Sequence, residues 1–254
     1  GGGVFASVDQ EGDVWIRFLH ELLPADARWV VATDTLLVVA GSYSAPVCSV
    51  DGGLDWMEAG QGLGGGAVEL LKLSCDGVLG ASLGRFMRFE AAAREWEVYA
   101  STPQNEEVCQ LSCHYPFLLC GTRWQGPYYS PNWGGYWVQG EVEGGALPVF
   151  LSVVEINEVC FAASMSSGLF RSNDFGGHWV ALNAGLPSEP MTLAVWKECM
   201  FAAGRSGVWL STNLGETWSN WSEGLSIPIA RMGDEPVLLV EGGFLFAGGG
   251  GIWK

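Results

Sequence analysis

Tryptophans recur along this chain at a nearly constant interval. Six of them are separated by 41, 40, 41, 42 and 39 residues, namely Trp15, Trp56, Trp96, Trp137, Trp179 and Trp218. A fixed period of this length is typical of proteins that stack copies of one supersecondary unit. The spacing predicts a single domain over residues 1–254, built from repeats of about 41 residues.

Each repeat has the pattern of four short strands. In the fifth repeat we expect strands over 191–196, 199–203, 207–211 and 217–221, with tight turns between them. Four short antiparallel strands at this period are typical of a β-propeller blade. The composition agrees, because 37 glycines suit many turns and 13 tryptophans suit packing between sheets. The sequence therefore predicts an all-β fold, a six-bladed β-propeller of four-stranded antiparallel blades.

The two ends of the chain match the same part of a repeat. Residues 246–254 and residues 3–7 both align with the segment 201–210 of the fifth repeat. We expect the N- and C-terminal strands to lie in one blade and to close the ring. Seven blades in a longer parent chain is the alternative, because it also explains why one strand is present twice.

A serine stands seven residues before four of the repeating tryptophans. The segments 49–56, 130–137, 172–179 and 211–218 fit S-x-[D/N]-x-G-x-x-W, the segment 7–15 is one residue longer, and 89–96 keeps only the tryptophan. Serine and aspartate side chains accept hydrogen bonds from turn amides, glycine adopts positive φ, and tryptophan packs beside the next strand. We predict this structural role for Ser7, Asp9, Trp15, Ser49, Asp51, Trp56, Ser130, Asn132, Trp137, Ser172, Asp174, Trp179, Ser211, Asn213 and Trp218.

These segments resemble the Asp box, also called the BNR repeat. Residues 168–172 and 182–187 are similar to noncatalytic bacterial propellers of the photosystem II stability and assembly factor type. Sialidases are similar in architecture only, because no Arg-Ile-Pro motif lies near the N-terminus and none of Arg28, Arg123, Arg205 and Arg231 has a matching context. The resemblance implies binding or assembly, although a fold does not by itself determine a function.

The best candidates for ligand contact lie on the connections expected opposite the Asp-box turns. The segment 123–129 is the richest, because an arginine beside aromatic rings suits stacking on a sugar or docking of a peptide. In the alternative interpretation the tyrosines of this segment belong to the core and Trp124 covers the blade. The candidate residues are Arg123, Trp124, Gln125, Tyr128, Tyr43 and Arg205.

No catalytic arrangement is recognisable in the sequence. His20, His114 and His178 are scattered, and His178 is the variable position before a repeating tryptophan, so we predict neither catalytic residues, nor a metal site, nor a cofactor. We therefore predict a nonenzymatic binding or scaffold propeller that presents its loops to a protein or a glycan. The alternative is a glycoside hydrolase, sialidase-like or similar to Asp-box glucanases, with acids drawn from separate blades.

Charge, hydropathy and cysteine content limit the classes of partner and bear on the location of the protein. A formal net charge of −16 repels phosphate backbones, so we expect no nucleic acid partner. No apolar run reaches the length of a membrane helix, so we expect a soluble protein without membrane insertion. Seven cysteines leave at least one unpaired, which favours free core thiols and a cytoplasmic location, whereas the family resemblance implies an extracytoplasmic one. Compartment and oligomeric state both stay open.

Overall fold

The structure of the chain is a computed structural model. It describes residues 5–7, 15–17, 20–25, 27–32, 35–41, 43–64, 68, 70–74, 77–114, 116–145, 148–164, 167–182, 185–186, 192–204, 207–222, 237–241, 244–248 and 252–253.

Residues 1–108 form one compact unit with two four-stranded sheets. Its first sheet, blade one, contains β3 (Ala27–Ala32), β4 (Leu37–Gly41), β5 (Val47–Ser49) and β6 (Met57–Glu58). Blade two contains β7 (Leu70–Ser74), β8 (Gly77–Ser82), β9 (Arg85–Glu90) and β10 (Glu95–Ser101). A separate pair contains β1 (Phe5–Ser7) and β2 (Trp15–Arg17), and a short 3-10 helix spans Pro103–Asn105.

Residues 109–254 form the second unit. Blade three contains β11 (Val108–His114), β12 (Phe117–Thr122), β13 (Gly126–Ser130) and β14 (Val138–Gln139). Blade four contains β16 (Phe150–Ile156), β17 (Val159–Ser164), β18 (Gly168–Ser172) and β19 (His178–Ala181), joined by β15 (Glu141–Val142). Blade five contains β20 (Thr192–Trp196), β21 (Cys199–Gly204), β22 (Gly207–Ser211) and β23 (Ser219–Asn220). A three-stranded sheet contains β24 (Val237–Glu241), β25 (Phe244–Gly248) and β26 (Ile252–Trp253).

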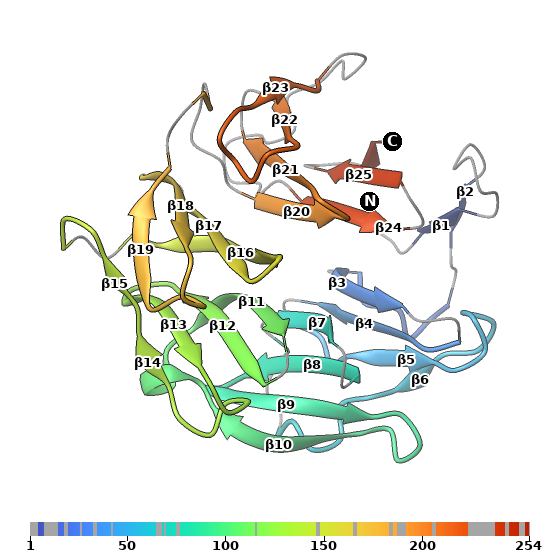
Figure 1. Cartoon of the computed structure of the whole chain (residues 1–254). Helices are drawn as coiled ribbons and strands as arrows, with labels where there is room; N and C mark the ends of the chain where they lie inside the picture. The colour runs from blue at the N-terminus through green and yellow to red at the C-terminus, as the bar shows by residue number, and fades with distance from the viewer. Residues whose placement is uncertain are drawn as a thin grey trace. The chain divides into compact units, whose positions relative to one another are not determined.

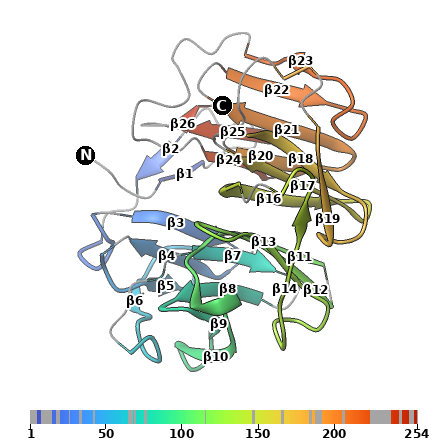
Figure 2. The same ribbon diagram turned by 90° about the vertical axis from the view of Figure 1, so that its left-hand side faces the viewer.

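Within each blade the strands lie side by side in chain order and pair antiparallel, as Figure 1 shows for both units. The order in blade five is β20, β21, β22 and β23 (Figure 2). Its first three strands begin within one residue of the predicted positions. Its last strand is shorter than predicted, because only Ser219 and Asn220 pair with β22.

The second strand of blade four is buried on both faces because it lies between blade three and blade five. In β17, Cys160 and Ala162 join the core shared with blade three. Phe161 and Ala163 alternate with them and join the core shared with blade five. Since successive side chains of a strand point to opposite faces, one short apolar strand contributes to two cores. Blade one and blade two share a similar core around Trp96.

The predicted tryptophan repeat is present in the described blades. Trp96 and Trp179 lie in the outermost strands β10 and β19, and Trp56, Trp137 and Trp218 come directly before β6, β14 and β23. Trp15 opens β2, and its side chain lies outside the described residues. The chain is thus an all-β β-propeller.

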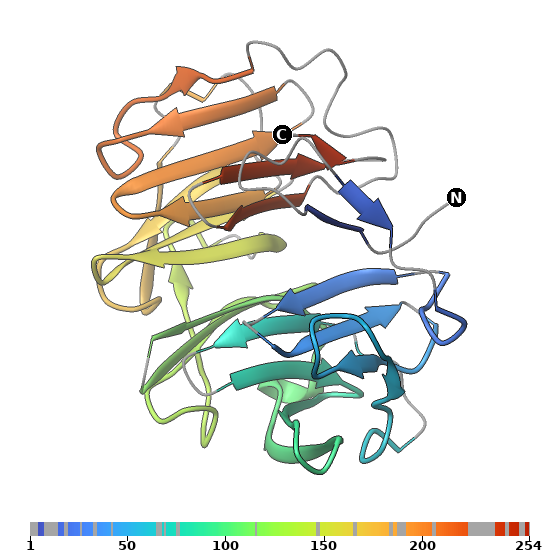
Figure 3. The ribbon, with the colours of Figure 1, turned by 90° about the vertical axis from the view of Figure 1, so that its right-hand side faces the viewer.

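The number of blades differs from the prediction. The described residues form five sheets of at least four strands, not six. The predicted shared blade is also not the pairing that the structure has, because β25 pairs with β26 and β1 pairs with β2 (Figure 3). A strand three residues away along the chain pairs at a far smaller cost in loop-closure entropy than one from the opposite end.

Candidate functional site

The predicted ligand segment forms a fixed turn between β12 and β13. The hydroxyl of Thr122 accepts a hydrogen bond from the amide of Gln125 at 3.3 Å and donates to the carbonyl of Gly126 at 2.9 Å. From β14, the side-chain amide of Gln139 donates to the carbonyl of Gln125 at 2.6 Å. The two bonds of Thr122 close the turn from inside, and the bond of Gln139 ties it to β14, so the turn is held from both sides.

The turn exposes Trp124 and Arg123. Trp124 is 70% exposed, and the guanidinium carbon of Arg123 lies 5.9 Å from the centre of its ring. This distance is within the range of a cation–π interaction, which limits the rotamers of both side chains. The alternative interpretation, in which Trp124 covers the blade, is therefore wrong. Trp124 presents a large aromatic surface to solvent.

The other candidates for ligand contact are placed differently. Tyr128 is only 2% exposed in β13, so in this structure it is a core residue of blade three and the prediction of a surface contact is wrong for it. Tyr43 is 93% exposed on the connection between β4 and β5 of the first unit. Arg205 lies outside the described residues. The structure thus brings together Arg123, Trp124 and Gln125 and adds Gln139, which the sequence did not single out.

The four turns at 49–56, 130–137, 172–179 and 211–218, here called the box turns, share one hydrogen-bond pattern. The serine hydroxyl donates to the side-chain oxygen of the Asp or Asn two residues later, at 2.7 Å or 3.0 Å. The same hydroxyl accepts the glycine amide four residues later, at 2.8–2.9 Å. The Asp or Asn oxygen accepts the amide of the residue before the tryptophan. The Asp and Asn oxygens of these turns are therefore engaged in holding the backbone.

The box tryptophans are anchored in the same way. The indole N–H of Trp56, Trp179 and Trp218 donates to the carbonyl of the box glycine three residues earlier, at 2.9–3.1 Å. Those glycines have φ between 81° and 98°, where a β-carbon would be strained. The pattern explains the S-x-[D/N]-x-G-x-x-W spacing as a folding device. Asp9 of the longer first segment lies outside the described residues, as do the side chains of Ser7 and Trp15.

Blade four carries a charged group that the sequence had treated as a variable position. The Nδ1 atom of His178 lies 2.5 Å from Oδ2 of Asp174, and its Nε2 atom lies 3.4 Å from Oε2 of Glu141. The hydrogen bond that His178 donates to Asp174, together with the charge of Asp174, raises the pKa of His178, with a smaller contribution from the charge of Glu141. The pKa of Asp174 is lowered, because the hydrogen bonds from His178 and Ser172 outweigh its desolvation. The i, i+4 spacing of Asp174 and His178 is the only sequence signal for this pair.

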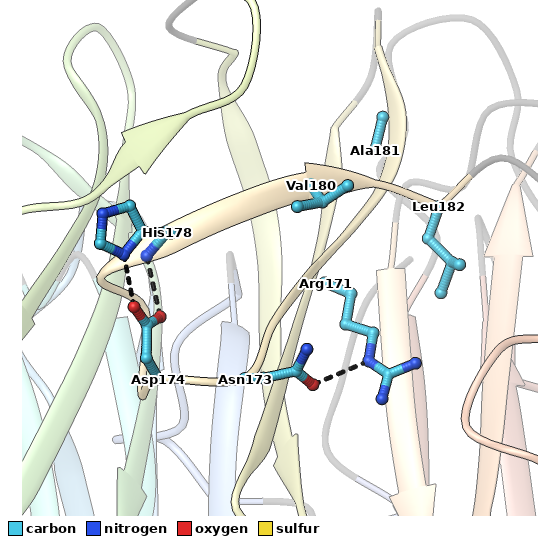
Figure 4. A pocket seen from close by; sticks show the side chains of 7 residues that line it. All are labelled: Arg171, Asn173, Asp174, His178, Val180, Ala181 and Leu182. Atoms are coloured by element: carbon cyan, nitrogen blue, oxygen red, sulfur yellow. Dashed lines mark hydrogen bonds and ion pairs between the residues drawn. The ribbon is translucent and has the colours of Figure 1, made fainter.

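A hollow of about 460 Å³ opens beside this pair, on the face of β18 and β19 (Figure 4). Figure 4 shows Asp174 and His178 at one end and Arg171 with Asn173 at the other. Arg171 donates to Asn173 at 3.0 Å and to Glu216 of blade five at 3.0 Å, so its charge is already paired. Val180, Ala181 and Leu182 complete the lining. The hollow is wide and shallow, with few groups directed at a common point.

The described part of the chain offers neither a metal site nor a reactive buried thiol. Among those residues no group of three or more His, Cys, Asp or Glu is placed to hold a metal ion. None of the described cysteines forms a disulfide; they are Cys48, Cys109, Cys113, Cys120, Cys160 and Cys199. Burial raises the pKa of Cys160 to about 12 and raises that of Cys120 as well, which keeps both thiols protonated and unreactive. No helix among the described residues is both long and apolar enough to cross a membrane.

Comparison with known proteins gives a fold but no family. No protein family and no curated protein matches the sequence. The solved structure "YCF48 bound to D1 peptide" matches with a TM-score of 0.59 and 19% identity over 78% of this chain and 68% of that one. An ancestral GH74 enzyme matches with a TM-score of 0.67 and 12% identity over 89% of this chain and 35% of that one. The extracellular domain of a hybrid two-component system from B. thetaiotaomicron matches with a TM-score of 0.68 and 12% identity, over 97% and 32%.

The last two structures are much longer proteins, of which this chain spans about a third. At these identities the likeness shows the fold alone, and the three matched proteins are of different kinds. The chain is similar in fold to YCF48 and to a GH74 enzyme, and that fold is the β-propeller.

Proposed function

We propose that this chain is a nonenzymatic binding propeller that docks a protein partner on the turn Arg123–Gln125. The observation that carries the proposal is the exposure of Trp124 on a turn fixed by Thr122 and Gln139. A tryptophan that is already ordered costs little entropy when it binds, and tryptophan and arginine are the side chains that most often dominate binding energy.

Two further facts support a binding role. The acids of the box turns, Asp51 and Asp174, already accept hydrogen bonds from their own turns, which favours a structural role over a chemical one. YCF48, which has a similar fold, is described in complex with a peptide. We infer on this basis that the box turns are Asp boxes and that the propeller acts as a scaffold for a protein segment.

The test is the affinity of the purified chain for a partner identified by cross-linking in its native source. Trp124→Ala is expected to weaken binding at least tenfold, since loss of a central aromatic contact costs about 2 kcal/mol or more. Tyr136→Ala is the matched control, because Tyr136 is also exposed, at 55%, but lies in a box turn. Equal affinities of the wild type and Trp124→Ala, measured by calorimetry, would show that this turn is not the docking site.

A glycoside hydrolase is the second candidate, favoured by the similarity to the GH74 enzyme. Its acids would come from the connections between blades, where Glu106, Glu107 and Glu143 are described. Hydrolysis of any member of a panel of β-glucans and sialosides, abolished by one of these Glu→Gln variants but not by Asp51→Asn, would favour catalysis. A glycan bound on Trp124 without hydrolysis would instead keep the binding role and change the partner from protein to sugar.

A further inference from the structure

The connection that leaves blade three pairs with the outer edge of blade four. β15 runs parallel to β19, with Glu141 opposite His178 and Val142 opposite Trp179 (Figure 1). The amide of Glu141 donates to the carbonyl of Gly177 at 2.7 Å, and the amide of Glu143 donates to the carbonyl of Trp179 at 2.9 Å. The segment 140–143 therefore follows blade three in the chain but adds an edge strand to blade four, held by two backbone hydrogen bonds.

One imidazole joins the two partners of this ladder. His178 begins β19 and contacts Asp174 in the box turn through Nδ1, and it contacts Glu141 on the connection through Nε2, at 2.5 Å and 3.4 Å. A protonated imidazole carries a donor on both nitrogens, whereas a neutral one carries a single donor. Only the protonated ring can donate to both carboxylates at the same time.

The surrounding charges leave this arrangement undisturbed. Glu143 follows on the same connection and adds a further negative charge. On the other side of the hairpin, Arg171 of β18 is paired with Glu216 from the box turn of blade five. The charged groups that face His178 from its own turn and from β15 are thus all carboxylates, which favours its cationic form.

We propose that His178 is a proton-dependent bridge that holds the segment 140–143 on the edge of blade four. The segment pairs most tightly while the imidazole is charged, and it opens more often once the proton is lost. Opening exposes the carbonyls of Gly177 and Trp179 on the edge of β19, so the bridge sets how readily this edge frees its backbone groups.

The direction of the pH dependence follows from the pKa of His178, which is raised above its ordinary value of 6.5. A raised pKa means that the contribution is fully present below the ordinary value and is lost as pH rises through the folded-state value. The contribution of Asp174, whose pKa is lowered from 3.8, is lost only in acid, as pH falls through its folded-state value. The contributions of His178 and Asp174 are therefore both fully present between about pH 4 and 6.5, and the contribution of His178 is lost as pH rises further, through its folded-state pKa.

Hydrogen exchange of single amides, measured by NMR between pH 5 and 9 and corrected for the intrinsic rate, tests the proposal on the full chain. Protection of the Glu141 and Glu143 amides is expected to fall by about two- to fivefold as pH rises, since His178 is exposed and exposed ion pairs contribute little. In His178→Gln, which keeps a polar side chain without the titration, the same step is expected to vanish.

Two amides serve as internal controls. The amide of Ala162, in the core strand β17, reports on opening of the whole blade. The amide of Trp96, which donates to the carbonyl of Gln61 at 2.9 Å, reports on the corresponding connection of blade two, where no histidine is present. Constant protection of Glu141 and Glu143 in the wild type would overturn the proposal. The proposal would also be overturned if the fall in protection with pH persisted in His178→Gln, or if the Ala162 amide showed a fall of the same size.

Discussion

At the scale of the residue, the box turns need an acceptor oxygen rather than a charge. Asp174 accepts the amide of His178 at 2.8 Å, and Asn132 and Asn213 accept the equivalent amides at 3.0 Å. The amide oxygen of asparagine has the same position and the same lone pairs as one carboxylate oxygen. Aspartate and asparagine are thus nearly equivalent in this position, and a side chain without an acceptor is not.

Substitution of Asp174 separates these two cases. Asp174→Ala leaves the turn amide and the hydroxyl of Ser172 without their acceptor, and we expect the free energy of unfolding to fall by about 1–2 kcal/mol. Asp174→Asn is expected to lose much less, because Asn213 does the same work in blade five. Urea denaturation at neutral pH measures both. Equal losses in the two variants would mean that the charge matters and not the acceptor.

The loss of stability in acid depends on the aspartates of the box turns, as Asp51 shows. Hydrogen bonds from the amide of Asp55 and the hydroxyl of Ser49 hold the pKa of Asp51 below its ordinary 3.8. A lowered pKa stabilises the fold above the ordinary value, and that contribution is lost as pH falls through the folded-state value. Between pH 5 and 2, the melting temperature of Asp51→Asn is therefore expected to fall by less than that of the wild type. Parallel curves for the two proteins would refute this.

At the scale of the element, the segment that enters a blade packs near the tryptophan of that blade in blades one, two and four. Leu22 and Leu23 pack against the core cluster that contains Trp56, and the indole of Trp96 donates to the carbonyl of Ala59 at 2.7 Å. In blade four, Gly140 takes this place beside Trp179. These connections thus help to bury the tryptophan at the outer edge of blades one, two and four.

Gly140 shows how little space this link leaves. A β-carbon there would lie 2.3 Å from the carbonyl oxygen of Gly176 and 2.8 Å from Nε1 of Trp179. We expect Gly140→Ala to lower the free energy of unfolding by about 1–3 kcal/mol, because the backbone must shift. Gly144→Ala is the control, since a β-carbon there meets nothing within 4 Å and only its φ of 86° is unfavourable. A loss no larger than that of the control would show that the link is not tightly packed.

At the scale of the whole molecule, the blades have no covalent cross-link among the described residues. The described cysteines form no disulfide, and blades three, four and five of the second unit are held together by cores that neighbouring blades share. Stability of this kind comes from nearest-neighbour packing, as in other repeat proteins. The net charge of −16 acts on the molecule in a different way, since it favours basic partners and solubility without determining the fold.

Reduction is therefore expected to leave the protein unchanged. The melting temperature with and without excess dithiothreitol should agree, because no disulfide among the described cysteines contributes to the folded state. A disulfide typically contributes about 2–4 kcal/mol, which shifts the melting temperature of a domain of this size by several degrees. A drop of that size on reduction would reveal a cross-link and would favour an oxidising compartment.

Several features of the fold and the site were predictable because they depend on contacts a few residues apart. The strands of the fifth repeat and the hydrogen bonds of Ser172 and Asp174 follow from spacing within one turn. The sequence left open whether Trp124 is exposed or covers the blade, and only the structure shows it 70% exposed. Tyr128 was misassigned, because strand alternation alone does not say which face of β13 a neighbouring blade covers.

The sequence by itself determined the repeat, the four-stranded unit and the structural role of the box turns, because each is written in residues that touch their near neighbours along the chain. Only the tertiary structure decided that β26 pairs with β25, that Glu141 meets His178, and that the described residues form five sheets of at least four strands and not six. These contacts join segments that are far apart in the repeat or compete with an equivalent partner elsewhere. Their outcome depends on loop-closure entropy and on packing between blades, which no local pattern records.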